Sequence, residues 1–99
     1  MKKTPTKNGK VSVTFELPAD VVAGQAVLFG DFNGWHNGTP MKRRKDGSYS
    51  AAVKLEPGRY RYRYLIDGVH WENDWNADEY VPNDYGSDDS VVEVPAVDA

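Results

Sequence analysis

The stretch from Arg59 to Ile66 constrains the fold of this chain more than any other, because its side chains alternate strictly in character. One set is aromatic or aliphatic and comprises Tyr60, Tyr62, Tyr64 and Ile66. The other set comprises Arg59, Arg61, Arg63 and Leu65. Successive side chains of a β-strand point to opposite faces of a sheet. The pattern therefore predicts a strand with a tyrosine face turned to a core and an arginine face turned outward.

Several other short segments have the same character, with alternating or continuous apolar residues. The predicted strands are residues 11–17, 26–29, 49–55, 59–66, 69–71 and 91–94. The turn signals between them include Asp46-Gly47, Glu56-Pro57-Gly58 and Asp67-Gly68. Residues 20–23 could form one helical turn at most. Short strands with turn signals about every ten residues are typical of an all-β protein folded as a β-sandwich.

Length and composition indicate one domain. The chain has 99 residues, 39% of them hydrophobic, which is enough for a single core. There is no cysteine, so disulfides and thiolate metal sites are excluded. We expect a flexible tail at residues 1–9, the sandwich at 10–95 and a second flexible tail at 96–99. The basic N-terminus lacks the apolar stretch of a signal peptide, which leads us to expect a cytoplasmic protein.

Charge is distributed unevenly along the chain. All 12 Lys and Arg lie at or before Arg63, whereas 10 of the 15 acids follow it, and the net charge is −3. Such asymmetry can indicate a polyanionic partner for the basic part. Attraction between two halves of a folded sheet explains it equally well. Because the bases are scattered over a tail, a turn and a strand, we expect no nucleic-acid partner, and no apolar run is long enough for a membrane span.

Trp35 ends the run Gly30-Asp31-Phe32-Asn33-Gly34, whose glycines and asparagine suit a tight turn. An amphipathic ring held on a stiff turn can stack on a sugar or a protein partner, or it can simply cap the core. For Trp71, beside a predicted hairpin, a stacking platform is the favoured interpretation. For Trp75, in a polar segment, a lid over one end of the sandwich is favoured.

Two charged features carry weaker signals. Three arginines on one strand face could bind sugar hydroxyls or phosphates, but cross-strand acids would satisfy them equally well. The acidic segment from Glu72 to Asp89 could hold calcium, yet its spacing matches no EF-hand, and a solvated loop is favoured. Its calcium candidates are Asp74, Asp78, Glu79, Asp84, Asp88 and Asp89. We find no catalytic motif, no metal site and no cofactor motif, so we do not expect an enzyme.

Six motifs in order resemble carbohydrate-binding module family 48, which includes the glycogen-binding domain of the AMP-activated protein kinase beta subunit and the early-set domains of isoamylases. They are Leu28–Trp35, Glu56-Pro57-Gly58, Tyr62–Gly68, Trp71, Asn83-Asp84-Tyr85-Gly86 and Ser90–Val94. The resemblance spans roughly residues 10–94. It implies an immunoglobulin-like early-set sandwich that binds α-1,4-linked glucans such as glycogen, starch or maltooligosaccharides.

The resemblance also implies a set of binding residues. Trp35 and Trp71 match the two tryptophans that stack on glucose rings, and Arg63 matches a basic residue that contacts hydroxyls. Tyr85 stands at an apolar loop position, and Ser87 and Asp89 match a Thr and an Asn that contact hydroxyls. Arg for Lys alters the reach of the cation, and Asp for Asn removes amide donors.

Two functions follow from the resemblance. The preferred one is non-catalytic glucan binding, with a glycogen-metabolising enzyme as a possible partner in trans. The alternative is a protein-docking early-set domain without a working sugar site. Retention of both Trp35 and Trp71 favours glucan binding, because a docking domain has no need of both.

Overall fold

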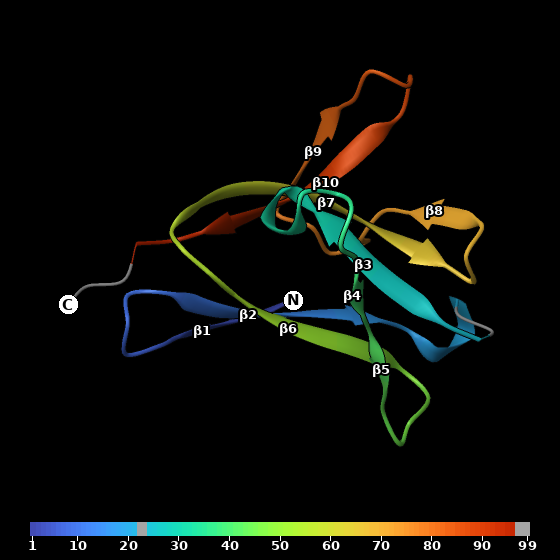
Figure 1. Ribbon diagram of the computed structural model, residues 1–99, viewed down its shortest axis with the longest axis horizontal. Coiled ribbons are helices and arrows are strands. Elements are labelled where there is room, and N and C mark those ends of the chain that lie inside the picture. The colour runs from blue at the N-terminus through green and yellow to red at the C-terminus, as the bar shows by residue number, and fades with distance from the viewer. Residues whose placement is uncertain (22–23, 97–99) are drawn as a thin grey trace.

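Two antiparallel sheets packed face to face form the protein in a computed structural model that describes residues 1–21 and 24–96 (Figure 1). The first sheet has the order β1-β2-β6-β5, and the second has the order β4-β3-β7-β10-β9, with β8 beside β7. The first sheet comprises β1 Lys2–Pro5, β2 Val11–Leu17, β5 Lys42–Arg43 and β6 Tyr49–Leu55. The second comprises β3 Ala26–Gly30, β4 Thr39–Pro40, β7 Gly58–Ile66, β8 His70–Glu72, β9 Glu79–Pro82 and β10 Asp88–Val94. Two short 3-10 turns, η1 Ala19–Val21 and η2 Asp31–Asn33, follow β2 and β3, and the predicted all-β sandwich is confirmed.

The core lies between the inner faces of the two sheets and is built around β2 and β7. Tyr62 and Tyr64 are fully buried, as the alternation in β7 predicts. The Tyr62 ring meets Phe15 of β2 edge-on, with 4.8 Å between ring centroids. Burying a side chain of this size contributes about 1.5–3 kcal/mol to folding. These two strands therefore hold the sheets together.

Strand β7 organises the outer face of the second sheet. On one edge it pairs with β3, with Tyr62 opposite Gly30 and Ile66 opposite Ala26. Its other edge is divided: the first half pairs with β10, and the last three residues pair with β8. Beyond the end of β7, β10 pairs with β9, and this hairpin projects away from the sandwich body (Figure 1). Arg63 lies between the two halves and faces outward.

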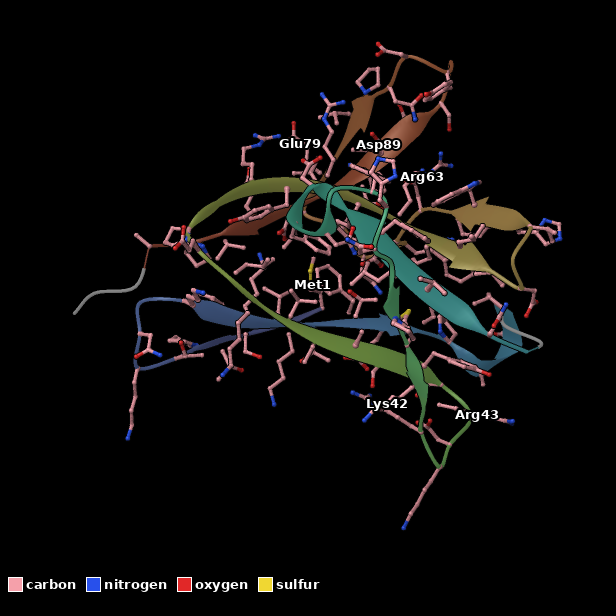
Figure 2. All side chains as sticks on the ribbon, viewed as in Figure 1. Met1, Lys42, Arg43, Arg63, Glu79 and Asp89 are labelled. Carbon is pink, nitrogen blue, oxygen red and sulfur yellow. The ribbon has the colours of Figure 1, made fainter. Side chains whose placement is uncertain are left out.

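The N-terminal segment differs from the expected flexible tail. Residues 2–5 form strand β1, paired in register with β2. Met1 packs against the core between the sheets (Figure 2), and the Lys3 ammonium lies 2.6 Å from the Asp78 carboxylate. The strand is polar and exposed, so its sequence gave no sign of the pairing. Of the predicted tail at 96–99, only Ala96 lies within the described residues. Of the predicted helical turn at 20–23, only residues 20 and 21 do.

The uneven charge along the chain is used inside the fold. Within the described ranges, four ion pairs join a base from the part of the chain up to Arg63 to an acid that follows it. They are Lys3–Asp78, Arg59–Glu79, Arg59–Glu93 and Arg61–Asp89. This supports the structural explanation of the asymmetry. The described part of the chain contains no helix long and apolar enough to cross a membrane.

Candidate functional site

A cleft of about 720 Å³ lies on the outer face of the second sheet. Its walls come from the turn after β3, from β7 and β8, and from the β9–β10 hairpin. It is lined by Asp31, Trp35, Arg61, Arg63, Trp71, Asn83, Asp84, Tyr85 and Asp89. Five of the six residues singled out in the sequence thus meet in one cleft; Ser87 is absent from its lining. Arg63 and Asp89 lie on the side of the molecule that carries the hairpin, far from Lys42 and Arg43 (Figure 2).

The turn that presents Trp35 is organised by Asn33. The Asn33 side-chain oxygen accepts a hydrogen bond of 3.0 Å from the Gly30 N–H, and its amide donates to the Leu28 carbonyl oxygen at 2.9 Å. A Cβ on Gly30 would lie 2.7 Å from both the Arg61 carbonyl oxygen and the Phe32 ring, so only glycine fits there. Trp35 itself has φ 61°, a left-handed conformation that non-glycine residues seldom adopt. The turn is therefore a rigid holder for one ring.

Asp31 links this ring to the sheet. One carboxylate oxygen accepts a hydrogen bond of 2.9 Å from the Trp35 indole N–H. The other accepts one of 2.8 Å from the Arg61 backbone N–H, just beyond the last paired residues of β3 and β7. The acid therefore fixes the ring at both a side-chain and a backbone contact. It also occupies the only polar atom of the indole, which leaves the ring face available for contact.

Trp71 forms the second aromatic wall. It lies on β8 opposite Leu65, is 45% exposed, and packs against Phe29 with ring centroids 5.3 Å apart. Phe29 in turn lies opposite Arg63 across β3 and β7. Arg63 is half-buried, and its Nε is buried without a hydrogen-bond partner. A cation with one buried, unpaired donor thus lines the cleft together with Trp71, and its cross-strand neighbour is the phenylalanine on which Trp71 packs.

The three arginines of β7 have different roles, although the sequence places them on one face. Arg59 forms ion pairs with Glu79 and with Glu93, its cross-strand neighbour on β10. It lies outside the cleft, as the structural interpretation predicted for most of the ladder. Arg61 lines the cleft 3.8 Å from the Asp89 carboxylate.

Asn83 organises the loop at the tip of the β9–β10 hairpin. Its side-chain oxygen accepts hydrogen bonds from the backbone N–H groups of Tyr85 at 2.9 Å and Ser87 at 3.1 Å. Its amide donates to the Asp89 carboxylate at 3.1 Å. Tyr85 is 92% exposed beside the cleft. Asp89 is buried under the loop, where its charge meets Asn83 and Arg61.

Sequence reasoning did not single out Asp31, Asn83 and Asp84 as sugar-binding residues, and it considered Arg61 only as one of the three arginines on the strand face. An Asp or Asn beside a turn glycine indicates a turn, and only the meeting of two loops brings these side chains into one wall. Three acids and two arginines line the cleft, so it carries little net charge and suits a neutral polar ligand better than a polyanion.

The acidic segment does not behave as one solvated loop, contrary to expectation. Asp74 is 5% exposed and accepts hydrogen bonds from the Tyr62 and Tyr64 hydroxyls at 2.7 and 3.2 Å. Burial, reinforced by the Asp74 charge, raises the pKa of both tyrosines far above its ordinary value. Within the described residues no group of acids and histidines is arranged to hold a metal ion. The segment's best-buried acid is part of the core.

The sequence matches the family described as "Glycogen recognition site of AMP-activated protein kinase" over residues 11–99. The chain belongs to this family. Members of this glycogen-recognition family are carbohydrate-binding, non-catalytic modules, in agreement with the resemblance found in the sequence. The match covers every strand except β1 and every residue of the cleft.

Two curated relatives are similar over a shorter stretch. Protein FLOURY ENDOSPERM 6, chloroplastic, from Oryza sativa subsp. japonica is 40% identical over 52 residues. Protein PTST homolog 2, chloroplastic, from Arabidopsis thaliana is 36% identical over 52 residues. Each match covers 52% of this chain and 10% of the relative, so the shared part is a small piece of both plant proteins. The prediction of a cytoplasmic protein is wrong by this comparison, because both relatives are named as chloroplastic.

Proposed function

We propose that this domain binds α-1,4-linked glucans, as found in glycogen and starch, in the cleft on the second sheet. Trp35 and Trp71 stack on glucose rings, and Arg63 donates hydrogen bonds to hydroxyl groups. The observation that carries the proposal is the meeting of these three side chains with Tyr85 in one cleft of a glycogen-recognition domain. The domain acts by binding and performs no reaction itself.

The chemistry of a pyranose ring suits this cleft. Its C–H groups form apolar faces that pack on aromatic rings, whereas its hydroxyls need donors and acceptors at the edge. The ring faces of Trp35 and Trp71 meet the first need. Arg63 offers donors, and the carboxylates of Asp31 and Asp84 offer acceptors for the second.

Three residues of the β9–β10 hairpin loop stand where the resemblance implies ligand contacts, and we propose different roles for them. Asp89 is held by Asn83 and Arg61, so we propose that it supports the loop and contacts hydroxyls little. Ser87 lies outside the cleft lining, and we therefore assign it no direct contact with a glucan bound in the cleft. Tyr85 adds a ring where its exposure lets it cover the ligand.

Titration with maltoheptaose tests the proposal. Wild-type protein should show a tryptophan fluorescence change and amide shifts around the cleft, with a dissociation constant between about 1 μM and 1 mM, or roughly −8 to −4 kcal/mol. The double variant Trp35→Ala/Trp71→Ala should lose the amide shifts around the cleft. A β-1,4-linked glucan of equal length is the linkage control. Absence of any response to millimolar maltoheptaose would contradict the proposal and leave the protein-docking alternative.

A further inference from the structure

Trp75 is a large exposed aromatic residue that the cleft does not use. It is 68% exposed and lies in the segment between β8 and β9. It lines a separate narrow crevice of about 40 Å³ at the end of the sandwich, and no residue lines both hollows. The expected lid role would bury this ring, and the observed exposure does not fit a lid.

The backbone beside Trp75 is fixed by the hydrogen bonds of its neighbour Asp74. Besides both tyrosine hydroxyls, the Asp74 carboxylate accepts a hydrogen bond of 2.9 Å from the Asn76 N–H. The Asp74 N–H donates to the Ser90 hydroxyl at 2.9 Å, and its carbonyl accepts from Tyr80. Burying a carboxylate carries a desolvation cost that only such a full set of partners offsets. The result is a stiff segment whose next residue is an exposed ring.

The surroundings of Trp75 combine apolar and polar groups at the scale of one sugar ring. The apolar part of the crevice is formed by Leu17, Pro18, Val21 and Ile66. Glu72 and Asn76 supply exposed polar groups beside the indole. A protein partner would need roughly 800 Å² of complementary surface on each side. A single ring flanked by acids and amides offers no such apolar area, whereas it matches the C–H face and hydroxyl rim of a pyranose.

We propose that Trp75 is a second carbohydrate-stacking platform, which contacts a glucan segment independently of the cleft. The choice of ligand rests on the proposed function, whereas the second site rests on the exposure and rigid support of Trp75. Because the backbone on both sides of Trp75 is held before binding, contact with a sugar immobilises little more than the indole itself. Two sites on one domain raise the apparent affinity for a branched or granular polysaccharide, which can reach both at once.

The first experiment separates the two sites by NMR. Maltoheptaose is titrated into the Trp35→Ala/Trp71→Ala variant while the indole N–H signal of Trp75 and the amides of residues 74–76 are followed. We expect shifts confined to this region at millimolar sugar. Shifts in wild type at the cleft alone would overturn the second site and leave the proposed function standing. Shifts around Trp75 alone in the wild-type protein would support the second site and refute the cleft, and no shifts anywhere in either protein would refute both.

The second experiment measures the gain from two sites. Trp75→Ala should lower the apparent affinity for amylopectin by about tenfold and leave maltotriose binding to the cleft unchanged. Trp75→Phe should retain most of the affinity, because it keeps an aromatic face. Val69→Ala is the matched control, since Val69 is a 70% exposed apolar residue outside both hollows. Equal amylopectin binding by wild type and Trp75→Ala would overturn the proposal.

Discussion

Trp35 and Trp75 are both presented next to an aspartate, but the two acids work differently. Asp31 is exposed and binds the Trp35 indole N–H directly, four residues along the chain. Asp74 is buried and fixes the backbone beside Trp75 through groups 10 to 16 residues away. One acid orients a ring, and the other anchors a segment to the core. The comparison teaches that an acid can support an aromatic surface either by binding the ring itself or by anchoring the backbone beside it.

Loss of the buried Asp74 carboxylate should reduce stability more than any other change considered. Asp74→Ala leaves the Tyr62 and Tyr64 hydroxyls and the Asn76 N–H without their carboxylate acceptor, and we expect the free energy of unfolding to fall by about 3–5 kcal/mol. Asp74→Asn keeps an acceptor and should cost less, about 1–2 kcal/mol. Chemical denaturation measures both. Equal loss in the two variants would show that the charge, and not the hydrogen-bonding geometry, holds the segment.

Steric crowding in the turn that presents Trp35 should cause the second-largest loss of stability. Gly30→Ala places a methyl group 2.7 Å from the Arg61 carbonyl oxygen, and we expect about 1–3 kcal/mol of destabilisation. Gly34→Ala is the matched control, since its Cβ meets no atom within 4 Å and only its φ of 67° is strained. That variant should lose about 1 kcal/mol. A larger loss in Gly34→Ala would mean that backbone conformation outweighs close approach here.

Removal of the exposed acid should act on binding more than on stability. Asp31→Ala frees the indole and the Arg61 N–H, and we expect about 1 kcal/mol of destabilisation with roughly fivefold weaker maltoheptaose binding. The indole N–H resonance of Trp35 should move even without sugar. Asp31→Asn keeps one acceptor and should fall between the two proteins. An unmoved indole resonance in Asp31→Ala would contradict the positioning role.

Loss of the ion pair between Lys3 of β1 and Asp78 should have the smallest effect on stability, and the size of that effect should depend on pH. Burial by itself raises the pKa of Asp78, but the Lys3 ammonium and the Glu93 N–H lower it below the ordinary 3.8 overall. A lowered folded-state pKa gives stability that is present above the unfolded value and lost as pH falls through the folded value. Lys3→Ala should therefore cost up to about 1 kcal/mol at neutral pH. The difference should shrink below pH 3.8 in thermal unfolding, and a difference that persisted there would exclude the ion pair as its cause.

Much of the fold could be predicted because its strands are encoded locally. The spans 11–17 and 49–55 match β2 and β6 to the residue, and the tyrosine face of β7 lies in the core. The exposed strands β1 and β9 and the two-residue strands β4 and β5 were missed. Their side chains show no alternation, because these strands lie at sheet edges where pairing, and not burial, holds them.

The candidate cleft was predicted only in part, for a related reason. Motifs in the sequence indicated Trp35, Arg63 and Trp71, which stand on or beside patterned strands. Asp31 and Asn83 were recognised as cleft residues only from the structure, because the turn after β3 and the β9–β10 loop are far apart in the chain and meet only in the folded protein. Ser87 shows the same limit, because its match to a hydroxyl-contacting residue of the family did not place it in the cleft lining.

The sequence by itself determined the period-2 strands, the turns and the family, since each depends on residues close together in the chain. Tertiary structure decided which charges are used where. It paired Arg59 with acids, left Arg63 with an unsatisfied donor and buried Asp74 beneath two tyrosines. Desolvation and pairing depend on neighbours distant in sequence, and these exist only once the two sheets have packed.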